Sequence, residues 1–269
     1  MIRGSTQLVA ILGTPIAQVK SPENFNRWFA DNDRDIAMLP IDLGAQALPD
    51  FIDTLRGWNN LRGCVVTVPY KQAVAPLLDA LTDRAAALGM ANVIRREADG
   101  RLVGDHLDGT GFLKAAAAHD FQPAGKRALV VGAGGVGAAI AYALAEQGVQ
   151  QLTLVDVREA QVEALRGVLL KAFPSLDVQA TYTDLSAFDL VVNATPVGMG
   201  DTGQMSLPSE QVATLRPHTL VADVVTSPQI TPLLAQAKAQ GCRIQTGPEM
   251  ARAQMGNLGA FMGVTPEDA

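Results

Sequence analysis

The stretch RALVVGAGGVGAAIAYALAEQG, residues 127–148, joins a short apolar run to a long alanine-rich run through a cluster of glycines. The first run has the composition of a buried parallel strand, and the second is typical of a helix. Gly132, Gly134 and Gly137 form the pattern G-x-G-x-x-G. In such a turn the first glycine permits the tight bend, the second lets the backbone approach a pyrophosphate, and the third brings helix against strand. Because a helix N-terminus attracts anions, the stretch predicts a dinucleotide site formed by Gly132, Ala133, Gly134, Gly135, Val136 and Gly137.

The next predicted strand, QLTLVDV, favours a dinucleotide site over a turn used only for packing. It leads into Asp156, about twenty residues beyond the glycines, where an acid can bind both hydroxyls of a ribose. The same carboxylate repels a 2′-phosphate, so the sequence predicts NAD as the cofactor. Arg158 leaves NADP open, because a guanidinium can bind that phosphate. Asp156 can also act as a helix N-cap, which does not exclude contact with a ribose.

The composition is that of an ordinary globular protein. Of the 269 residues, 48% are hydrophobic and 18% are charged, and the net charge of −6 disfavours binding to nucleic acid or a membrane surface. No apolar run approaches the ~20 residues that span a bilayer, and no secretory signal is visible. Cys64 and Cys242 have neither a metal-ligand spacing nor a disulfide framework. We therefore expect a cytoplasmic protein with no metal, nucleic-acid or membrane partner.

Strand and helix signals alternate along nearly the whole chain, which predicts an α/β fold of parallel sheets with covering helices. An Asp-Gly at residues 99–100, between apolar alternations, predicts a hairpin. Before the glycines, the other predicted elements are strands at 8–12, 36–43 and 64–68 and helices at 21–33, 48–57, 71–80 and 82–88. After them, strands are predicted within QLTLVDV, FDLVVNATPVGM, HTLVADVV and CRIQTG, and helices within EAQVEALRGVLLKAF, TPLLAQAKAQG and PEMARAQMGNLGAFMG. We predict two α/β domains that meet near residue 105.

The segment GCVVTVPYK, residues 63–71, predicts a strand that Pro69 ends, because proline lacks a backbone donor. Lys71 follows at the strand end. An enzyme that oxidises an alcohol with nicotinamide must remove the hydroxyl proton, and a partly desolvated lysine beside a carboxylate can do so. Asp108, in GDHLDGTG, supplies a carboxylate where the chain passes to the second domain. The ordinary alternatives are a solvated surface lysine and a cap on a helix that starts at Gly109.

Several ordered motifs resemble those of the shikimate and quinate dehydrogenases. The similarity runs from about Leu12 to Gly263. The resemblance implies an N-terminal substrate domain and a Rossmann domain, with the last helix returning to the first domain. This gives residues 1–105, completed by 247–269, and residues 106–246. The motifs are GTPIAQVKSP, GCVVTVPYK, MANVI, GDHLDGTG, GAGGVG, VVNATPVGM and TPLLAQAKAQGC.

The resemblance also implies an activity and a set of site residues. Lys71 and Asp108 would form the catalytic pair, with Lys71 exchanging the hydroxyl proton. Hydride would pass between the nicotinamide cofactor and the ring hydroxyl of shikimate, quinate or a related cyclic hydroxy acid, in the shikimate pathway of aromatic amino acid biosynthesis. The residues implied for substrate are Ser21, Thr67, Asn92 and Gln254, and those implied for cofactor are Asn193, Thr195, Val224, Gly247 and Met250.

The chain departs from the family pattern at positions expected to bind substrate. A serine of the usual S-x-S is Val19, and the asparagine usually found two residues before Thr67 is Val65. Each lost hydrogen bond to a charged group is worth roughly 1.5–3 kcal/mol, so shikimate affinity would fall about 10²–10⁴-fold without compensation. Lys20 and His106 are possible replacements, although each has an ordinary surface or packing role. The other departures are His106 for asparagine, Leu107 for threonine, Thr226 for tyrosine and Glu249 for glycine.

These departures leave a second function open, a non-catalytic protein that senses a dinucleotide or a metabolite on the same fold. Retention of both Lys71 and Asp108 favours the enzyme, because a sensor needs no proton-transfer pair. A methylene-tetrahydrofolate dehydrogenase shares the two-domain plan, but the motifs fit it poorly. The sequence leaves the oligomeric state open.

Overall fold

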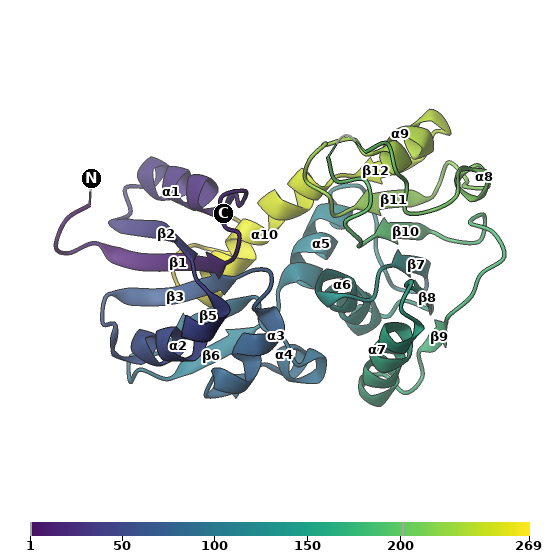
Figure 1. The fold of residues 1–269 in the computed structure, drawn as a ribbon. Coiled ribbons are helices and arrows are strands. Elements are labelled where there is room, and N and C mark those ends of the chain that lie inside the picture. Colours follow the sequence, from purple (N-terminus) through teal and green to yellow (C-terminus); the bar gives the residue numbers. More distant parts are fainter. Residues whose placement is uncertain (1, 201) are drawn as a thin grey trace. The chain divides into compact units, whose positions relative to one another are not determined.

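The computed structural model describes residues 2–200 and 202–269, and it confirms the α/β fold class (Figure 1). The chain forms two compact units. The first comprises the residues up to 107 together with 255–269, and the second comprises residues 108–254. The units therefore divide two residues after the predicted boundary at 105 and eight residues after the one at 246.

The first unit contains a mixed six-stranded sheet of order β2-β1-β3-β5-β6-β4. β1 is parallel to β2 and β3, and β4 is parallel to β6, whereas β5 is antiparallel to both of its neighbours. The predicted hairpin accounts for this, because a short connection can join only antiparallel strands. The strands are β1 (Gln7–Gly13), β2 (Ile36–Asp42), β3 (Leu61–Val66), β4 (Ala80–Leu81), β5 (Val93–Arg96) and β6 (Leu102–Asp105).

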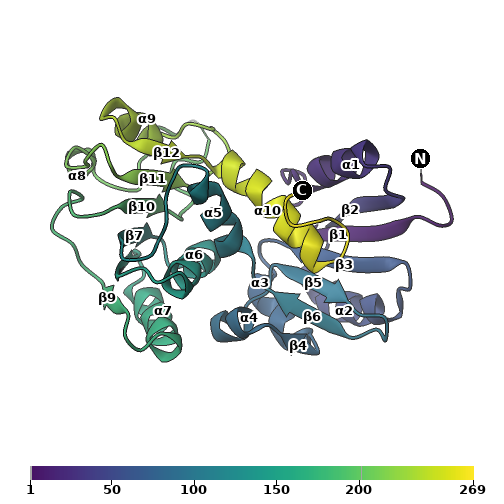
Figure 2. The same ribbon diagram turned by 180° about the vertical axis from the view of Figure 1, so that it is seen from behind.

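Helices cover both faces of this sheet. Alternate residues of β1 point to opposite faces, so that Ala10 and Leu12 pack with α2 (Leu48–Gly57) while Val9 and Ile11 pack with α1 (Ser21–Asp31). The end of α10 (Gly247–Phe261) joins α1 on its face, and Figures 1 and 2 show it on the side of the sheet opposite to α2. The unit also contains α3 (Lys71–Val74), α4 (Asp83–Leu88) and short 3-10 turns at Ala45–Ala47 and Ala75–Leu77.

The second unit contains a fully parallel six-stranded sheet of order β12-β11-β10-β7-β8-β9. This is the doubly wound order, in which the chain reverses direction across the sheet between β7 and β10 and ligands bind beyond the carboxyl ends of the strands. The strands are β7 (Arg127–Val131), β8 (Gln151–Val155), β9 (Asp177–Gln179), β10 (Leu190–Asn193), β11 (Leu220–Asp223) and β12 (Arg243–Gln245).

The helices of the second unit are α5 (Asp108–Ala117), α6 (Gly135–Glu146), α7 (Glu159–Ala172), α8 (Ser209–Val212), α9 (Pro232–Ala239) and the first part of α10. Asp108 is the first residue of α5, whereas the sequence suggested a start at Gly109. β9 and α8 are absent from the predicted elements, because three or four residues are too short to show a period. Within residues 2–200 and 202–269, no helix has the length and apolar character needed to cross a membrane.

A substitution of Gly63, on β3, would test how closely the first unit is packed. A Cβ at this position would lie 2.3 Å from the carbonyl oxygen of Ile94 on β5 and 2.7 Å from Cγ of Met262. Because the carbonyl is fixed in the sheet, Gly63→Ala should lower the free energy of unfolding by about 1–3 kcal/mol, as overpacking does. Denaturant unfolding followed by circular dichroism measures this change.

Gly57→Ala is the matched control, because Gly57 is exposed at the end of α2 and a Cβ there would meet nothing within 4 Å. This variant should unfold at the wild-type denaturant concentration or slightly above it. Equal stability of the two variants would contradict the packing described for Gly63.

Candidate functional site

The glycine turn between β7 and α6 is built for close approach of backbone. Gly132 has a φ of 103°, and a Cβ there would lie 2.9 Å from Thr195 Cγ2. A Cβ on Gly137 would lie 1.8 Å from the Gly132 carbonyl oxygen, so only glycine lets α6 pack this closely against the turn. Gly134 caps α6, which begins at Gly135. The geometry gives the glycines the turn and packing roles that their spacing predicts.

Asp156 links the end of β8 to this turn. Its Oδ2 accepts a hydrogen bond of 2.8 Å from Ala133 N–H, and its Oδ1 accepts one of 2.9 Å from Arg158 N–H. Burial raises the pKa of the carboxyl, but these bonds and the Arg158 guanidinium outweigh that effect and hold it below its usual value. Arg158 Nε lies 3.6 Å from Oδ1. Asp156 is therefore a fixed, charged group at the carboxyl end of the sheet.

A cavity of about 690 Å³ lies beside these two features, within the second unit. Its size is in the range of pockets that bind small ligands and cofactors. Among the predicted cofactor residues, the cavity is lined by Gly132, Gly134, Asp156, Arg158 and Thr195, and Ala133, Gly135, Val136, Gly137, Asn193, Val224, Gly247 and Met250 do not line it.

The far wall of the cavity was missed by sequence reasoning. Tyr182 and Gln211 both line it, and the Tyr182 hydroxyl donates a hydrogen bond of 2.6 Å to Gln211 Oε1. The apolar residues Leu207 and Pro208 lie between Tyr182 and Gln211 in the chain and line the same cavity. Tyr182 follows the unpredicted β9 and Gln211 lies on the unpredicted α8, so neither had a recognised element to place it.

Asn193 organises the loop that follows β10. Its Oδ1 accepts hydrogen bonds from Thr195 N–H at 3.1 Å and from Thr195 Oγ1 at 2.7 Å, and its Nδ2 donates to the Val197 carbonyl at 3.0 Å. Asn193 is buried, whereas Ala194, Thr195 and Val197 line the cavity. Its side chain therefore shapes the cavity wall from behind.

The start of α10 carries the predicted residues Gly247, Met250 and Gln254. Thr246 N–H and Oγ1 donate to Glu249 Oε2 at 2.7 and 2.8 Å, a capping arrangement that fixes the first turn. Glu249 Oε1 also lies 3.3 Å from His119 Nε2. Glu249, where the family pattern has glycine, therefore has a structural role that its position alone did not suggest.

Gln254 and Asp108 lie side by side in the second unit. Gln254 Nε2 donates a hydrogen bond to Asp108 Oδ1. The approach of α5 to α10 is close, because a Cβ on Gly111 would lie 2.8 Å from Cβ of Gln254. The structure thus brings together a predicted catalytic carboxylate and a predicted substrate contact.

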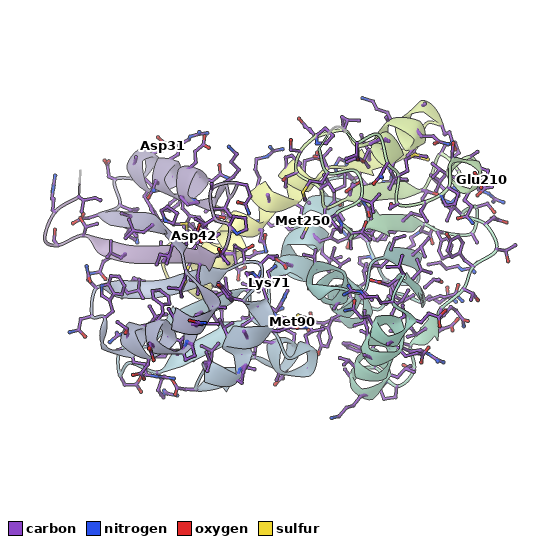
Figure 3. All side chains as sticks on the ribbon, in the orientation of Figure 1. Asp31, Asp42, Lys71, Met90, Glu210 and Met250 are labelled. Carbon is purple, nitrogen blue, oxygen red and sulfur yellow. The ribbon has the colours of Figure 1, made fainter. Side chains whose placement is uncertain are left out.

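Lys71 and Asn92 are neighbours in the first unit. Lys71 is the half-buried first residue of α3 (Figure 3), and its carbonyl accepts a hydrogen bond of 2.8 Å from Ala91 N–H. Asn92 is buried, and its Oδ1 accepts a hydrogen bond of 2.8 Å from Leu107 N–H. The half-buried Thr67 follows β3 directly. Its carbonyl accepts a hydrogen bond of 3.0 Å from Tyr70 N–H, in the turn that leads to Lys71. The structure therefore brings three predicted residues together where β3 ends.

Ser21 is the first residue of α1. Three positions that depart from the family pattern, Val19, Val65 and Leu107, belong to an apolar region of the first unit. Val65 and Leu107 are buried in one hydrophobic cluster, and Val19 packs against it. Lys20 is 75% exposed and lies 3.8 Å from Glu23, as expected for a surface residue. Three positions that depart from the family pattern therefore contribute to the same hydrophobic cluster.

An ion pair between the partly exposed Arg84 and the buried Asp105, also missed from sequence, fixes the segment before Asp108. Arg84 Nε lies 2.8 Å from Asp105 Oδ1 and Nη2 lies 2.8 Å from Oδ2, and Thr82 and the His106 N–H also donate to Oδ1. Burial raises the pKa of Asp105, but the Arg84 and Thr82 hydrogen bonds outweigh it and hold that pKa below its usual value. Arg84 and Asp105 are far apart in sequence, so no local pattern pairs them.

Asp105→Asn should lower the free energy of unfolding by roughly 2–4 kcal/mol at neutral pH, because Arg84 loses its charged partner in a buried site. A lowered folded-state pKa gives stability that is present above the unfolded-state pKa of about 4 and is lost as pH falls through the folded-state value. The difference from wild type should therefore shrink below about pH 4.

Urea unfolding at a series of pH values measures this, with the exposed Asp53→Asn on α2 as the control that should change little. A difference between wild type and Asp105→Asn that stays constant down to the acid limit would contradict the ion-pair assignment.

Comparisons with known proteins show which family the chain is similar to. The family model described as the shikimate dehydrogenase substrate binding domain matches residues 11–94. The NADP(+) shikimate dehydrogenase of Moorella thermoacetica is 36% identical over 93% of this chain and 85% of its own length. The NAD(+) quinate/shikimate dehydrogenase of Corynebacterium efficiens is 34% identical over 97% of this chain and 94% of its own length.

The solved structures include a protein of similar fold with ligands bound. Shikimate 5-dehydrogenase from Listeria monocytogenes, in complex with shikimate and NAD, has a TM-score of 0.88 and 30% sequence identity. The match covers 96% of this chain and 91% of that one. The likeness thus extends over both units.

Proposed function

Because the chain belongs to the shikimate and quinate dehydrogenase family and is an NAD(P)-dependent dehydrogenase, we propose that it acts on a ring hydroxyl of shikimate, quinate or a related cyclic hydroxy acid. The observation that carries the proposal is the hydrogen bond between Gln254 and Asp108. It fixes the carboxylate of Asp108, which the motif resemblance implies for catalysis, beside a side chain that can bind a hydroxyl. The Listeria relative binds shikimate and NAD together, which supports this substrate class.

The proposal gives each side chain a task. The nicotinamide, when bound, supplies the hydride acceptor. Lys71 Nζ takes the hydroxyl proton as the alcohol becomes a ketone, and returns it in the reverse direction. Asp108 is proposed as the carboxylate of the pair, because a carboxylate favours the protonated form of a catalytic base and orients it. Ser21, Thr67, Asn92 and Gln254 hold the polar groups of the substrate.

The units divide this work. We propose that the first unit, predicted from sequence as residues 1–105 with 247–269, binds substrate, and that the second, predicted as 106–246, binds the dinucleotide. The glycine turn and the cavity beside it support the second assignment. A cytoplasmic location is supported by the two buried free thiols, Cys64 and Cys242.

Asp156 supports NAD over NADP. Its side chain is only 7% exposed and keeps its charge, and it lines the cavity where a ribose would bind. Its fixed carboxylate would repel a 2′-phosphate. The Arg158 side chain is 64% exposed, and its Nε lies 3.6 Å from Asp156 Oδ1. Arg158 also lines the cavity, so it is the residue that would meet a 2′-phosphate if NADP were bound.

The substrate pocket of the first unit is proposed to be less polar than the family pattern. Val19, Val65 and Leu107 offer no hydrogen bond where serine, asparagine and threonine are usual. We infer that shikimate is held more weakly than in the typical member, and that quinate or a related acid competes with it. Lys20, exposed and beside Glu23, is not a replacement for these contacts.

Lys71→Ala should lower kcat with shikimate or quinate about 10²–10⁴-fold, the usual contribution of a positioned base. The dissociation constant for NAD should not change, because Lys71 is not part of the second unit. Initial rates of reduced-nicotinamide formation and a calorimetric titration with NAD measure the two quantities.

The control is Lys238→Ala, which removes an exposed lysine of α9 and should leave both quantities at wild-type values. A kcat for Lys71→Ala within a few-fold of wild type would contradict the catalytic assignment. Binding of NAD by wild type without turnover of any hydroxy acid would favour the sensing function.

Asp156→Asn should raise the ratio of kcat/KM with NADP to kcat/KM with NAD about 10–100-fold, because removing a nearby charge changes the interaction with a phosphate by roughly 1–3 kcal/mol. Glu159→Gln, at the exposed start of α7, changes the net charge equally but lies outside the cavity lining and should leave the ratio unchanged. A ratio that rises equally in both variants would point to net charge and contradict the Asp156 assignment.

A further inference from the structure

The carboxylate of Asp223 is buried behind the loops proposed to hold the cofactor. Asp223 ends β11 and is paired in the sheet with Asn193, which ends β10. The residues Asp223, Asn193 and Thr231 are 2%, 1% and 1% exposed, and none of them lines the cavity. Burying a carboxylate is costly unless it is hydrogen-bonded, and burial does raise the pKa of Asp223. Its contacts explain what this buried charge does.

Asp223 joins three separate segments of the second unit. Its Oδ1 accepts hydrogen bonds from Asn193 Nδ2 at 3.1 Å and from Val225 N–H at 2.9 Å. Its Oδ2 accepts one of 2.7 Å from the Thr231 hydroxyl, and that hydroxyl oxygen accepts Leu234 N–H at the start of α9. The end of β10, the turn after β11 and the cap of α9 are therefore held by one side chain.

The contact with Asn193 decides how the cavity wall is arranged. A carboxylate only accepts hydrogen bonds, so it binds the NH₂ side of the Asn193 amide and leaves the oxygen to face Thr195. That oxygen accepts both Thr195 N–H and Thr195 Oγ1. The same NH₂ group holds the Val197 carbonyl. A reversed amide would lose these contacts, and the wall formed by residues 194–197 would be released.

The contact with Val225 extends the effect to α10. A Cβ on Gly247 would lie 2.2 Å from the Val225 carbonyl oxygen and 2.7 Å from that of Val224, so the first residue of α10 rests directly on this turn. Val224 N–H also donates a hydrogen bond of 3.0 Å to the Asn193 carbonyl. The loop after β10 and the start of α10 are thus fixed from a common point.

We propose that Asp223 is a positioning residue that sets the affinity for the dinucleotide through Asn193 and Val225 without touching the ligand. The inference rests on the proposed use of the cavity for NAD. Protein stability and ligand affinity should respond differently to changes around this carboxylate, because only one of its side-chain partners leads to the cavity wall.

The test compares Asp223→Asn with Thr231→Val. Asp223→Asn replaces the acceptor-only group by an amide that no longer fixes the orientation of Asn193, and KM and the dissociation constant for NAD should rise about tenfold or more, the loss of roughly one charge-assisted hydrogen bond. Thr231→Val removes the bond to Oδ2 and the cap of α9 but keeps the path to Asn193. It should lower the melting temperature and leave KM for NAD unchanged.

KM for the hydroxy acid should stay at the wild-type value in both variants. Asn193→Ser, which shortens the link and keeps Asp223, should raise KM for NAD in the same way and replaces Asp223→Asn if that variant does not fold. An unchanged KM for NAD in the Asp223→Asn or Asn193→Ser variant, or an equal rise in Thr231→Val, would overturn the inference.

Direct calorimetric titration with NAD separates this inference from the proposed reaction. Wild type that binds NAD but oxidises no hydroxy acid would contradict the proposed reaction, while a weaker affinity for NAD in Asp223→Asn alone would still support the positioning role. Wild type that binds neither NAD nor NADP would contradict the use of the cavity and overturn the inference with it.

Discussion

The hydrogen bond from Ala133 N–H to Asp156 Oδ2 is the interaction on which the proposed nucleotide site depends. It joins the glycine turn after β7 to the end of β8, and so fixes the two edges of the cavity relative to each other. A buried backbone N–H must find a partner, and here the partner is the acid that is proposed to favour NAD over NADP. Under that proposal, one contact fixes the turn and places the group that selects the cofactor.

The same physical device recurs around the candidate site. A buried or partly buried carboxylate, which can only accept hydrogen bonds, binds backbone N–H groups where a strand or helix begins or ends. Each such acid lies beside a predicted functional segment and holds it, and Asp156 is in addition a predicted cofactor ligand. The pairs are Asp105 with His106, Asp156 with Ala133 and Arg158, Asp223 with Val225, and Glu249 with Thr246.

Sequence patterns predicted the α/β class, the hairpin and the glycine turn, because local periodicity and turn chemistry determine these features. They missed β9 and α8, which are too short to show a period, and with them Tyr182 and Gln211 of the cavity. The Arg84–Asp105 ion pair and the Glu249–His119 contact join distant parts of the chain, so no spacing predicts them. The catalytic roles of Lys71 and Asp108 stay predictions, carried by motif resemblance.

Initial rates for the wild-type enzyme, with shikimate and quinate each paired with NAD and with NADP, test the central claim most directly. The account predicts reduced-nicotinamide formation with at least one of the two acids, and a larger kcat/KM with NAD than with NADP. Turnover with NADP alone would contradict the assignment of Asp156. Absence of turnover in all four pairs, with NAD still bound, would contradict the proposed reaction.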